Sequence, residues 1–369
     1  MTATGPLARQ VPLTLTPLRR YAVARSLFAP TTLPKALQRL GFVQADPLRA
    51  PARAQDLTLR HRVAGYRAGD LEARYPRLGI EEDFFVNYGF VQRELTHLMH
   101  PRHPRKAWPD GRLAQAQEVL AFVRERGVVR PAEVDAHFDH GHITNWFGGR
   151  SKASTQLLDD MHYRGLLRVA RREGGQRLYA PCASRPEAPG RDAALDALID
   201  AIVSLYAPLP AASLGHLVSL LSGGVPQWHD HRKTALLRAQ ARLPNARVSG
   251  VTWYWPEGDN PASRRYAVDE QVRLLAPFDP VVWDRRRFEL LWGWAYRFEA
   301  YTPAAQRVRG HYALPLLWRD QVIGWANLSA KGGVLTPDIG FVNETPSEKA
   351  FSTALDEELH RMSVFLALH

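Results

Sequence analysis

One order of predicted elements occurs twice in the chain, and this repeat restricts the possible folds more than any other feature of the sequence. In the first copy, apolar residues at helical spacing predict three helices, and two strand-like segments follow around a Gly174-Gly175 turn. Three helices followed by a hairpin with a basic tip are typical of the winged-helix form of helix-turn-helix. The predicted helices are 113–126, 131–138 and 152–164, and the predicted strands are 166–172 and 176–179.

A second copy follows a linker rich in proline and glycine at residues 181–190. Its helices and hairpin are predicted at 192–205, 211–221, 232–243 and 246–255. The segment up to about Met99 is a candidate for a third, more divergent copy. A tandem array of this kind offers one basic face in each unit.

The last third of the chain changes in character. Turns at Arg319-Asp320 and Lys331-Gly332 join strand-like segments, which indicates an antiparallel sheet or a small barrel, followed by a helix over 348–368. The strand-like segments are 273–278, 297–301, 311–318, 321–330 and 333–342. We predict an α+β fold in which tandem winged helix-turn-helix units precede a C-terminal antiparallel β-barrel-like domain. The predicted domains are 1–106, 107–182, 190–260 and 264–369.

Composition narrows the possible functions. The formal net charge of +11 favours a polyanion, with nucleic acid as the first candidate, although a merely basic surface gives the same excess. A single cysteine, Cys182, excludes a disulfide framework and multi-cysteine zinc sites. No apolar run reaches the length of about 18 residues needed to cross a membrane. We predict a cytoplasmic monomer without a cofactor.

Histidines at His97, His100 and His103 are spaced in a way that suggests a metal site. Pro101 and Pro104 interrupt any helical face that these histidines could share, and no carboxylate cluster accompanies them. A basic linker without a metal is therefore the preferred interpretation.

Basic residues mark candidate phosphate contacts. A helix predicted to run from about Pro51 to Val63 places three arginines in one stripe, although Asp56 lies in the same stripe and ordinary surface pairs are the alternative. The third helix and the hairpin of the first winged-helix unit carry a second group of basic residues. The candidates are Arg49, Arg53 and Arg60 in the stripe, and Lys152, Arg164, Arg171, Arg172 and Arg177 in the winged helix.

Gln44 and Asp46 stand two residues apart at the end of an apolar run. If the run is a strand, its alternation puts both side chains on one face and Ala45 on the other. Two such groups can hold one water molecule. The alternative is structural, with Asp46 capping a turn before Pro47 and Gln44 bonded to the backbone.

Several segments resemble the AlkZ/YcaQ-type winged-helix DNA glycosylases. The resemblance rests on residues 274–285 (LLAPFDPVVWDR), on 299–303 (EAYTP) with 312–318 behind it, and on 41–46, which matches the family's Gln-x-Gln or Gln-x-Asp catalytic motif. It implies tandem winged helices ahead of a β-barrel-like domain around a DNA-sized cleft. Two segments depart from the family's pattern: residues 85–90 replace an aromatic-rich stretch, and Gln306 stands where a lysine is usual.

The resemblance implies excision of alkylated bases from double-stranded DNA, and in some members the unhooking of interstrand crosslinks. It makes Asp46 the carboxylate that stabilises the oxocarbenium-like sugar and accepts a proton from water, and Gln44 the group that orients this water. Tyr301, Arg307 and Arg309 are then candidates to line the cleft. The competing hypothesis is a catalytically silent DNA-binding protein, such as a regulator, in which both polar residues are structural.

Overall fold

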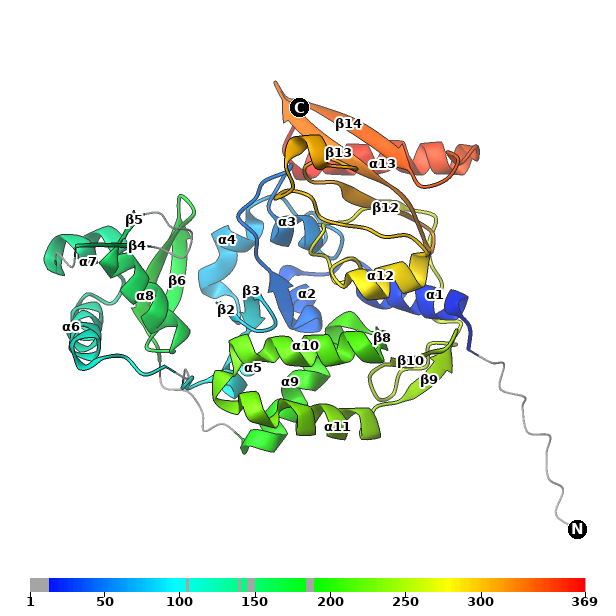
Figure 1. Ribbon diagram of the computed structural model, residues 1–369. Coiled ribbons are helices and arrows are strands. Elements are labelled where there is room, and N and C mark those ends of the chain that lie inside the picture. Colours follow the sequence, from blue (N-terminus) through cyan, green and yellow to red (C-terminus); the bar gives the residue numbers. More distant parts are fainter. Residues whose placement is uncertain (1–12, 104–105, 139–140, 145–149, 184–188, 369) are drawn as a thin grey trace, which may run out of the picture.

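The computed structural model describes residues 13–103, 106–138, 141–144, 150–183 and 189–368. Its first part packs helices around a three-stranded antiparallel sheet with the strand order β1-β3-β2 (Figure 1). The helices are α1 (Leu15–Ser26), α2 (Leu33–Leu40), α3 (Ala54–Leu59), α4 (Asp70–Arg74), η1 (Tyr75–Arg77) and α5 (Arg93–Met99). The strands are β1 (Phe42–Gln44), β2 (Ile80–Phe84) and β3 (Tyr88–Gln92). The apolar and aromatic residues at 84–91 predict one buried strand. This prediction is wrong, because β2 ends at Phe84 and β3 begins at Tyr88, so the segment includes the turn of the β2–β3 hairpin.

Helix α2 sets the position of β1. Leu33, Leu37 and Leu40 recur at helical spacing and are buried, so this face of the helix packs into the core. The helix ends at Gly41, whose φ of 72° reverses the chain at low cost because glycine has no side chain. Strand β1 therefore begins directly behind the helix, at Phe42.

The second part contains the predicted order of three helices and a hairpin, with a short strand pair that the sequence did not predict. Its elements are α6 (Asp110–Arg126), α7 (Pro131–Phe138), β4 (His142–Thr144), β5 (Arg150–Lys152), α8 (Ala153–Tyr163), β6 (Leu167–Glu173) and β7 (Gln176–Pro181). Strand β6 pairs with β7, and β4 with β5, in both cases antiparallel. The assignment of this part as a winged helix stays a prediction.

The third part repeats helices before a small sheet with the order β8-β10-β9. Its elements are α9 (Arg191–Tyr206), β8 (Leu209–Pro210), α10 (Ala211–Gly224), η2 (Pro226–His231), α11 (Arg232–Arg242), β9 (Asn245–Val248) and β10 (Val251–Tyr254).

The C-terminal part is an open sheet with the order β11-β12-β13-β14, in which β11 and β14 form the two edges. Its elements are β11 (Val272–Leu274), α12 (Arg285–Trp292), η3 (Ala304–Gln306), β12 (Leu314–Trp318), β13 (Gln321–Lys331), β14 (Val334–Phe341) and α13 (Lys349–Phe365). Within the described residues this sheet does not close, which corrects the barrel-like prediction. The strand predicted at 297–301 is not formed, and four strands are fewer than the about five of the smallest common barrels.

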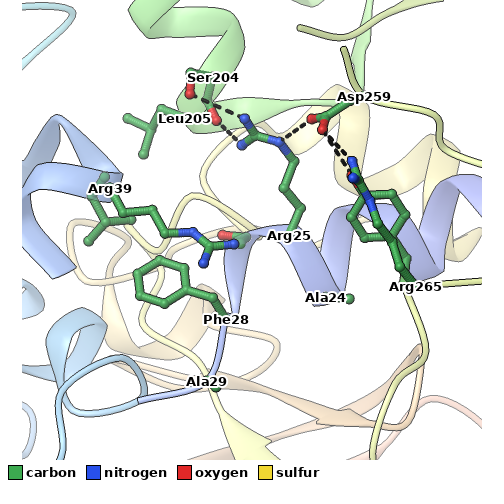
Figure 2. A pocket seen from close by; sticks show the side chains of 12 residues that line it. Ala24, Arg25, Phe28, Ala29, Arg39, Ser204, Leu205, Asp259 and Arg265 are labelled. Carbon is green, nitrogen blue, oxygen red and sulfur yellow. Dashed lines mark hydrogen bonds and ion pairs between the residues drawn. The ribbon is translucent and has the colours of Figure 1, made fainter. Parts of the chain in front are cut away.

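Buried ion pairs join the parts. Arg62 donates two hydrogen bonds to Asp279, and both side chains are fully buried, so the segment before β2 is fixed to the loop after β11. Arg25 on α1 donates to Asp259, next to Ser204 on α9 (Figure 2). No helix in the described ranges is both long and apolar enough to span a bilayer.

Candidate active site

Gln44 is the last residue of β1 and is only 8% exposed. Its side-chain oxygen Oε1 is buried and accepts no hydrogen bond from the described residues. Directly opposite in the sheet is Gly89, where a Cβ atom would lie 2.3 Å from the carbonyl oxygen of Val43. Strand β3 therefore approaches β1 closely because residue 89 has no side chain.

Asp46 lies beyond the end of β1, in a turn. Its Oδ1 accepts a hydrogen bond of 2.9 Å from the backbone N–H of Leu48, and its own N–H donates to Gln55 Oε1 at 3.4 Å. The turn predicted by the structural alternative is thus present, but it uses only one carboxylate oxygen, and Oδ2 has no hydrogen bond to any described residue. Burial raises the pKa of Asp46, against the opposing effect of the Leu48 N–H.

Tyr312 is a further candidate for this site, and the sequence indicates only the segment 312–318 that contains it, not the residue itself. Its hydroxyl is buried without a partner among the described residues. Burial, and then the charge of Asp46, raise the pKa of this hydroxyl, so Tyr312 lies within electrostatic range of the carboxylate. The Tyr312 ring packs edge-on against Phe298, which also contacts Phe278 and Tyr301.

The arginine stripe predicted from about Pro51 is not present, because α3 has only six residues and Arg49 precedes it. Arg53 forms an ion pair with Glu72. Arg60 is buried against Glu358, with 4% and 0% of the two side chains exposed, and has no free surface for a phosphate. Arg49 alone of these three is exposed.

Two arginines of the β6–β7 hairpin turn inward. Arg172 donates to both carboxylate oxygens of Glu82, which is fully buried, and Arg177 lies 3.6 Å from the same carboxylate. Arg177 also lies over the ring of Tyr88, whose hydroxyl donates to Glu82. These contacts fix the hairpin to β2 and β3, next to the strand that carries Gln44.

The other basic candidates of this part lie nearer the surface. Arg171 pairs with Glu173, and Lys152 pairs with Asp135, both with half-exposed basic side chains. Arg164 lies over the ring of Trp108 and donates to the carbonyl of Lys106.

A loop between Glu299 and Gly310 presents the C-terminal candidates. Glu299 accepts hydrogen bonds from the backbone N–H groups of Val308 and Arg309, which closes the loop. Tyr301 at 78% and Val308 at 76% are the most exposed large side chains of this loop. Arg309 lies over Trp294 and Trp325, and Arg307 donates to the carbonyl of Thr302.

The segment predicted as a basic linker contains instead a buried ionic network. Asp83 accepts from Arg102 at 2.6 Å, and its other oxygen lies 2.7 Å from Nε2 of His100. Burial opposes ionisation of Asp83, but Arg102 and His100 outweigh it and hold the pKa of this carboxyl below its usual value. Pairing with β2 explains why these cations are inside rather than on a solvated linker.

A comparison with known proteins adds to this geometry. The family described as DNA glycosylase AlkZ-like matches residues 37–365. The chain belongs to the AlkZ-like DNA glycosylase family. Among solved structures, the Streptomyces sahachiroi DNA glycosylase AlkZ is similar, with a TM-score of 0.63 and 13% sequence identity over 96% of this chain and 97% of that chain. At this identity the structural match shows a shared fold, and membership of the AlkZ-like family rests on the sequence match.

Proposed function

We propose that the protein is a DNA glycosylase that hydrolyses the N-glycosidic bond of purines alkylated at N7 or N3, including purines held in interstrand crosslinks. The observation that carries the proposal is the group of side-chain atoms without partners around β1. Gln44 Oε1, Asp46 Oδ2 and the Tyr312 hydroxyl have no hydrogen-bond partner in the described part of the chain. Gln44 Oε1 and the Tyr312 hydroxyl are buried, and buried polar atoms are rarely left in this state, so the site is suited to a bound water and substrate.

The reaction follows from these groups. The bond between C1′ of the sugar and the purine nitrogen breaks, and its electron pair neutralises the positive charge of the alkylated base. Asp46 stabilises the positive charge that develops on the sugar and takes a proton from water, whose oxygen bonds to C1′. Gln44 orients this water through its free acceptor. The alkylated base leaves without a general acid because it already carries the charge.

The proposed DNA surface combines the exposed and half-buried candidates and leaves out Arg60. Its members are Arg49, Lys152, Arg164, Arg171, Tyr301, Arg307 and Arg309. Arg53, Arg172 and Arg177 support this surface through their carboxylate partners. Each arginine or lysine that contacts a phosphate adds about 1 to the slope of log affinity against log salt. Arg49→Ala is expected to reduce this slope, measured with an undamaged duplex.

The test is release of base from a duplex with a single N7-methylguanine and from a duplex with a nitrogen-mustard crosslink. Asp46→Asn is expected to lower the rate about a hundredfold or more, and Gln44→Ala to lower it less, while duplex binding is retained. Asp70→Asn is the matched control, because Asp70 also accepts a backbone N–H in a turn, from Arg67. Absence of release from both substrates, with DNA binding intact, would favour the silent DNA-binding protein.

A further inference from the structure

A hollow lies between the start of α10 and the loop that leads into α12. It has a volume of about 570 Å³ and is lined by His216, Ser213, Trp283, Asp284, Arg285 and Arg286 among others. Pockets of this size hold small planar ligands. Gln44 and Asp46 are not among its lining residues, so the hollow is separate from the proposed catalytic site.

The aromatic rings of His216 and Trp283 both line this hollow. His216 and Trp283 are nearly parallel, at 17°, with centroids 6.4 Å apart. This distance is within the range of an aromatic pair and sets an upper limit on the gap between the ring planes, whereas a base stacked on both rings needs about twice the ~3.4 Å spacing of stacked bases. A planar ring fits between them once the exposed His216 side chain turns outward from Trp283.

The Trp283 side of the pocket is held in place by packing and hydrogen bonds. Trp283 packs against Tyr206, with centroids 5.6 Å apart. Arg287, which is 1% exposed, donates to the carbonyls of Tyr206 and Val281 and ties this loop to the end of α9. His216 is exposed on α10 and can adjust to a ligand.

Polar groups complete the pocket. Ser213 and Asp284 are 2% and 8% exposed, and Oγ of Ser213 and Oδ2 of Asp284 have no hydrogen-bond partner in the described ranges. The other oxygen of Asp284 caps α12 by accepting the N–H of Arg287. A hydroxyl and a carboxylate match the donors and acceptors on the edge of a nucleobase. Arg285 and Arg286 are exposed beside them and suit a phosphate.

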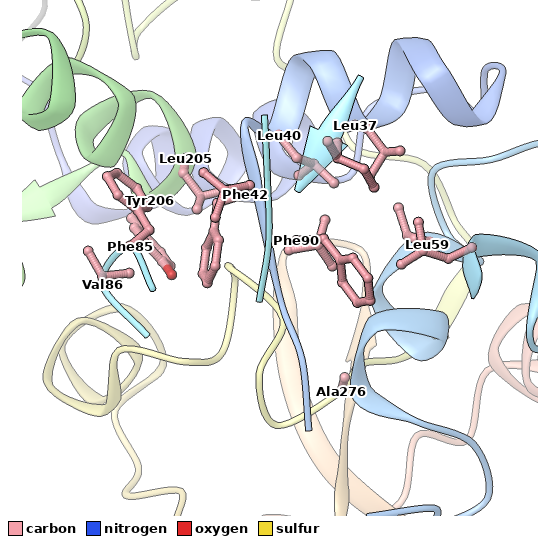
Figure 3. Packing of buried hydrophobic residues seen from close by; sticks show 14 of the residues in the cluster. Leu37, Leu40, Phe42, Leu59, Phe85, Val86, Phe90, Leu205, Tyr206 and Ala276 are labelled. Carbon is pink, nitrogen blue, oxygen red and sulfur yellow. The ribbon is translucent and has the colours of Figure 1, made fainter. Parts of the chain in front are cut away.

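Packing connects this pocket to the strand that carries Gln44. Figure 3 shows Tyr206 beside Phe85 and Phe42, and the rings of Phe42 and Phe85 are in edge-on contact at 5.7 Å. Trp283 packs against the same hydrophobic core that contains Tyr206, Phe85 and Phe42 of β1. Because Gln44 and Asp46 do not line the pocket, a nucleotide held there is a different nucleotide from the one cleaved.

We propose that this pocket holds one unstacked nucleobase of the bound DNA between His216 and Trp283, with Arg285 and Arg286 on its phosphate. The inference rests on the proposed function, because it takes DNA as the ligand. Stacking of a base on aromatic side chains contributes about 1–3 kcal/mol per base. Loss of one ring is therefore expected to weaken binding about tenfold.

The test uses the Asp46→Asn protein, so that binding is measured without base release. Duplexes carry 5-iododeoxyuridine at successive positions around an N7-methylguanine, and ultraviolet crosslinks are mapped by mass spectrometry. A crosslink to Trp283 or His216 from one position is expected, and His216→Ala is expected to abolish it and to weaken binding about tenfold. Because His216 is exposed, this variant should fold; Trp283→Leu is the second variant.

Matched controls separate the pocket from general effects. His360→Ala removes another exposed helical histidine, and Arg247→Ala another exposed arginine, both outside the pocket. Neither should change the crosslink, whereas Arg285→Ala and Arg286→Ala should each lower the salt dependence of binding.

Three outcomes would overturn the proposal. The first is crosslinking that avoids both rings, with unchanged affinity in His216→Ala and Trp283→Leu. The second is a free deoxynucleoside monophosphate that binds the wild type and not His216→Ala, with no crosslink from DNA. The third is a crosslink that survives His216→Ala and Trp283→Leu. Base release by the wild type is scored separately, so a glycosylase without this pocket is distinguished from a DNA-binding protein with it.

Discussion

Two polar clusters lie at the two edge strands of the first sheet, β2 and β1, and differ in how their polar atoms are hydrogen-bonded. On β2, both oxygens of the buried Asp83 are engaged, by Arg102 and His100. Beyond β1, Asp46 uses one oxygen in a turn, and the nearby Tyr312 hydroxyl has no partner among the described residues. The first cluster stabilises the fold through its internal hydrogen bonds, whereas the second leaves polar atoms that no described residue hydrogen-bonds.

The comparison explains how a chain rich in arginine can have few arginines for DNA. Arg60, Arg62 and Arg102 have almost no exposed side chain and are each paired with a carboxylate. A buried charge is tolerated only when it is paired and hydrogen-bonded. Net charge therefore overstates the number of phosphate contacts, and the exposure of each arginine decides which of them remain available.

The largest effect is expected on breaking the satisfied cluster. Arg102→Met leaves Asp83 buried without its main partner and also removes donors to the carbonyls of Phe84 and Tyr163. Loss of one partner from a buried pair costs about 3–5 kcal/mol in the free energy of unfolding. Urea denaturation of Arg102→Met measures this loss. Arg130→Met is the control, since Arg130 pairs with Glu173 at the surface and should unfold like the wild type. Equal stability of both variants would contradict the difference drawn between the clusters.

A steric change at the second cluster is expected to be the next largest. Gly89→Ala places a Cβ atom 2.3 Å from the Val43 carbonyl oxygen and 2.9 Å from the Gln44 Cα, so β1 or β3 must move. Overpacking of this kind costs about 1–3 kcal/mol, and the displacement of Gln44 should also lower base release. Thermal unfolding and the release assay measure the two effects. At Gly79, by contrast, an added Cβ atom meets nothing within 4 Å, so Gly79→Ala should behave as the wild type.

The elements that local spacing governs were predictable. The helices over 191–206 and 211–224 lie within two or three residues of their predicted ends, because buried residues such as Leu195, Leu198 and Ile202 recur at helical spacing. Apolar residues at helical spacing over 33–40, followed by a glycine, predict a helix that ends at Gly41, and α2 ends there, with the strand that carries Gln44 directly behind it.

Contacts between distant segments were not predictable. Arg172 and Glu82 are ninety residues apart in sequence and meet only because the hairpin docks on β2. The helix expected to run to Val63 is shorter at both ends: Arg53 is extended, with ψ of 152°, so α3 begins only at Ala54, and it ends at Leu59, before Val63 bridges to Thr31. Tyr312 comes within electrostatic range of Asp46 from another part of the fold, and no spacing within either segment predicts this proximity.

A substitution in the second cluster should change base release without changing the free energy of unfolding. Tyr312→Phe removes a hydroxyl that has no partner among the described residues, so the free energy of unfolding should stay the same, while base release should fall about tenfold. Tyr296→Phe is the matched control, because the buried Tyr296 hydroxyl donates to the carbonyl of Ala313 at 2.8 Å. It should lose about 1 kcal/mol of stability and keep its rate of release. The opposite pattern in the two variants would assign Tyr312 to the core.

The smallest expected effect is on the pH dependence of stability, where the two aspartates should differ in sign. The pKa of Asp83 is lowered in the folded state, so its contribution is present above the unfolded pKa of about 3.9 and is lost as pH falls through the folded value. The pKa of Asp46 is raised, mainly by burial, so the folded state binds its proton more tightly and stability decreases as pH rises from about 3.9 through the folded value.

Substitution should therefore have opposite consequences. Asp83→Asn is expected to be less stable than the wild type at pH 7, with a difference that shrinks in acid. Asp46→Asn is expected to be slightly more stable at pH 7, because it removes a charge that burial disfavours, with a difference that also shrinks in acid. Urea titrations of the three proteins at several pH values measure both differences. A stabilised but inactive Asp46→Asn is the result expected of a carboxylate kept for chemistry at the expense of the fold, whereas a destabilised one would mean that the turn to Leu48 is its main role.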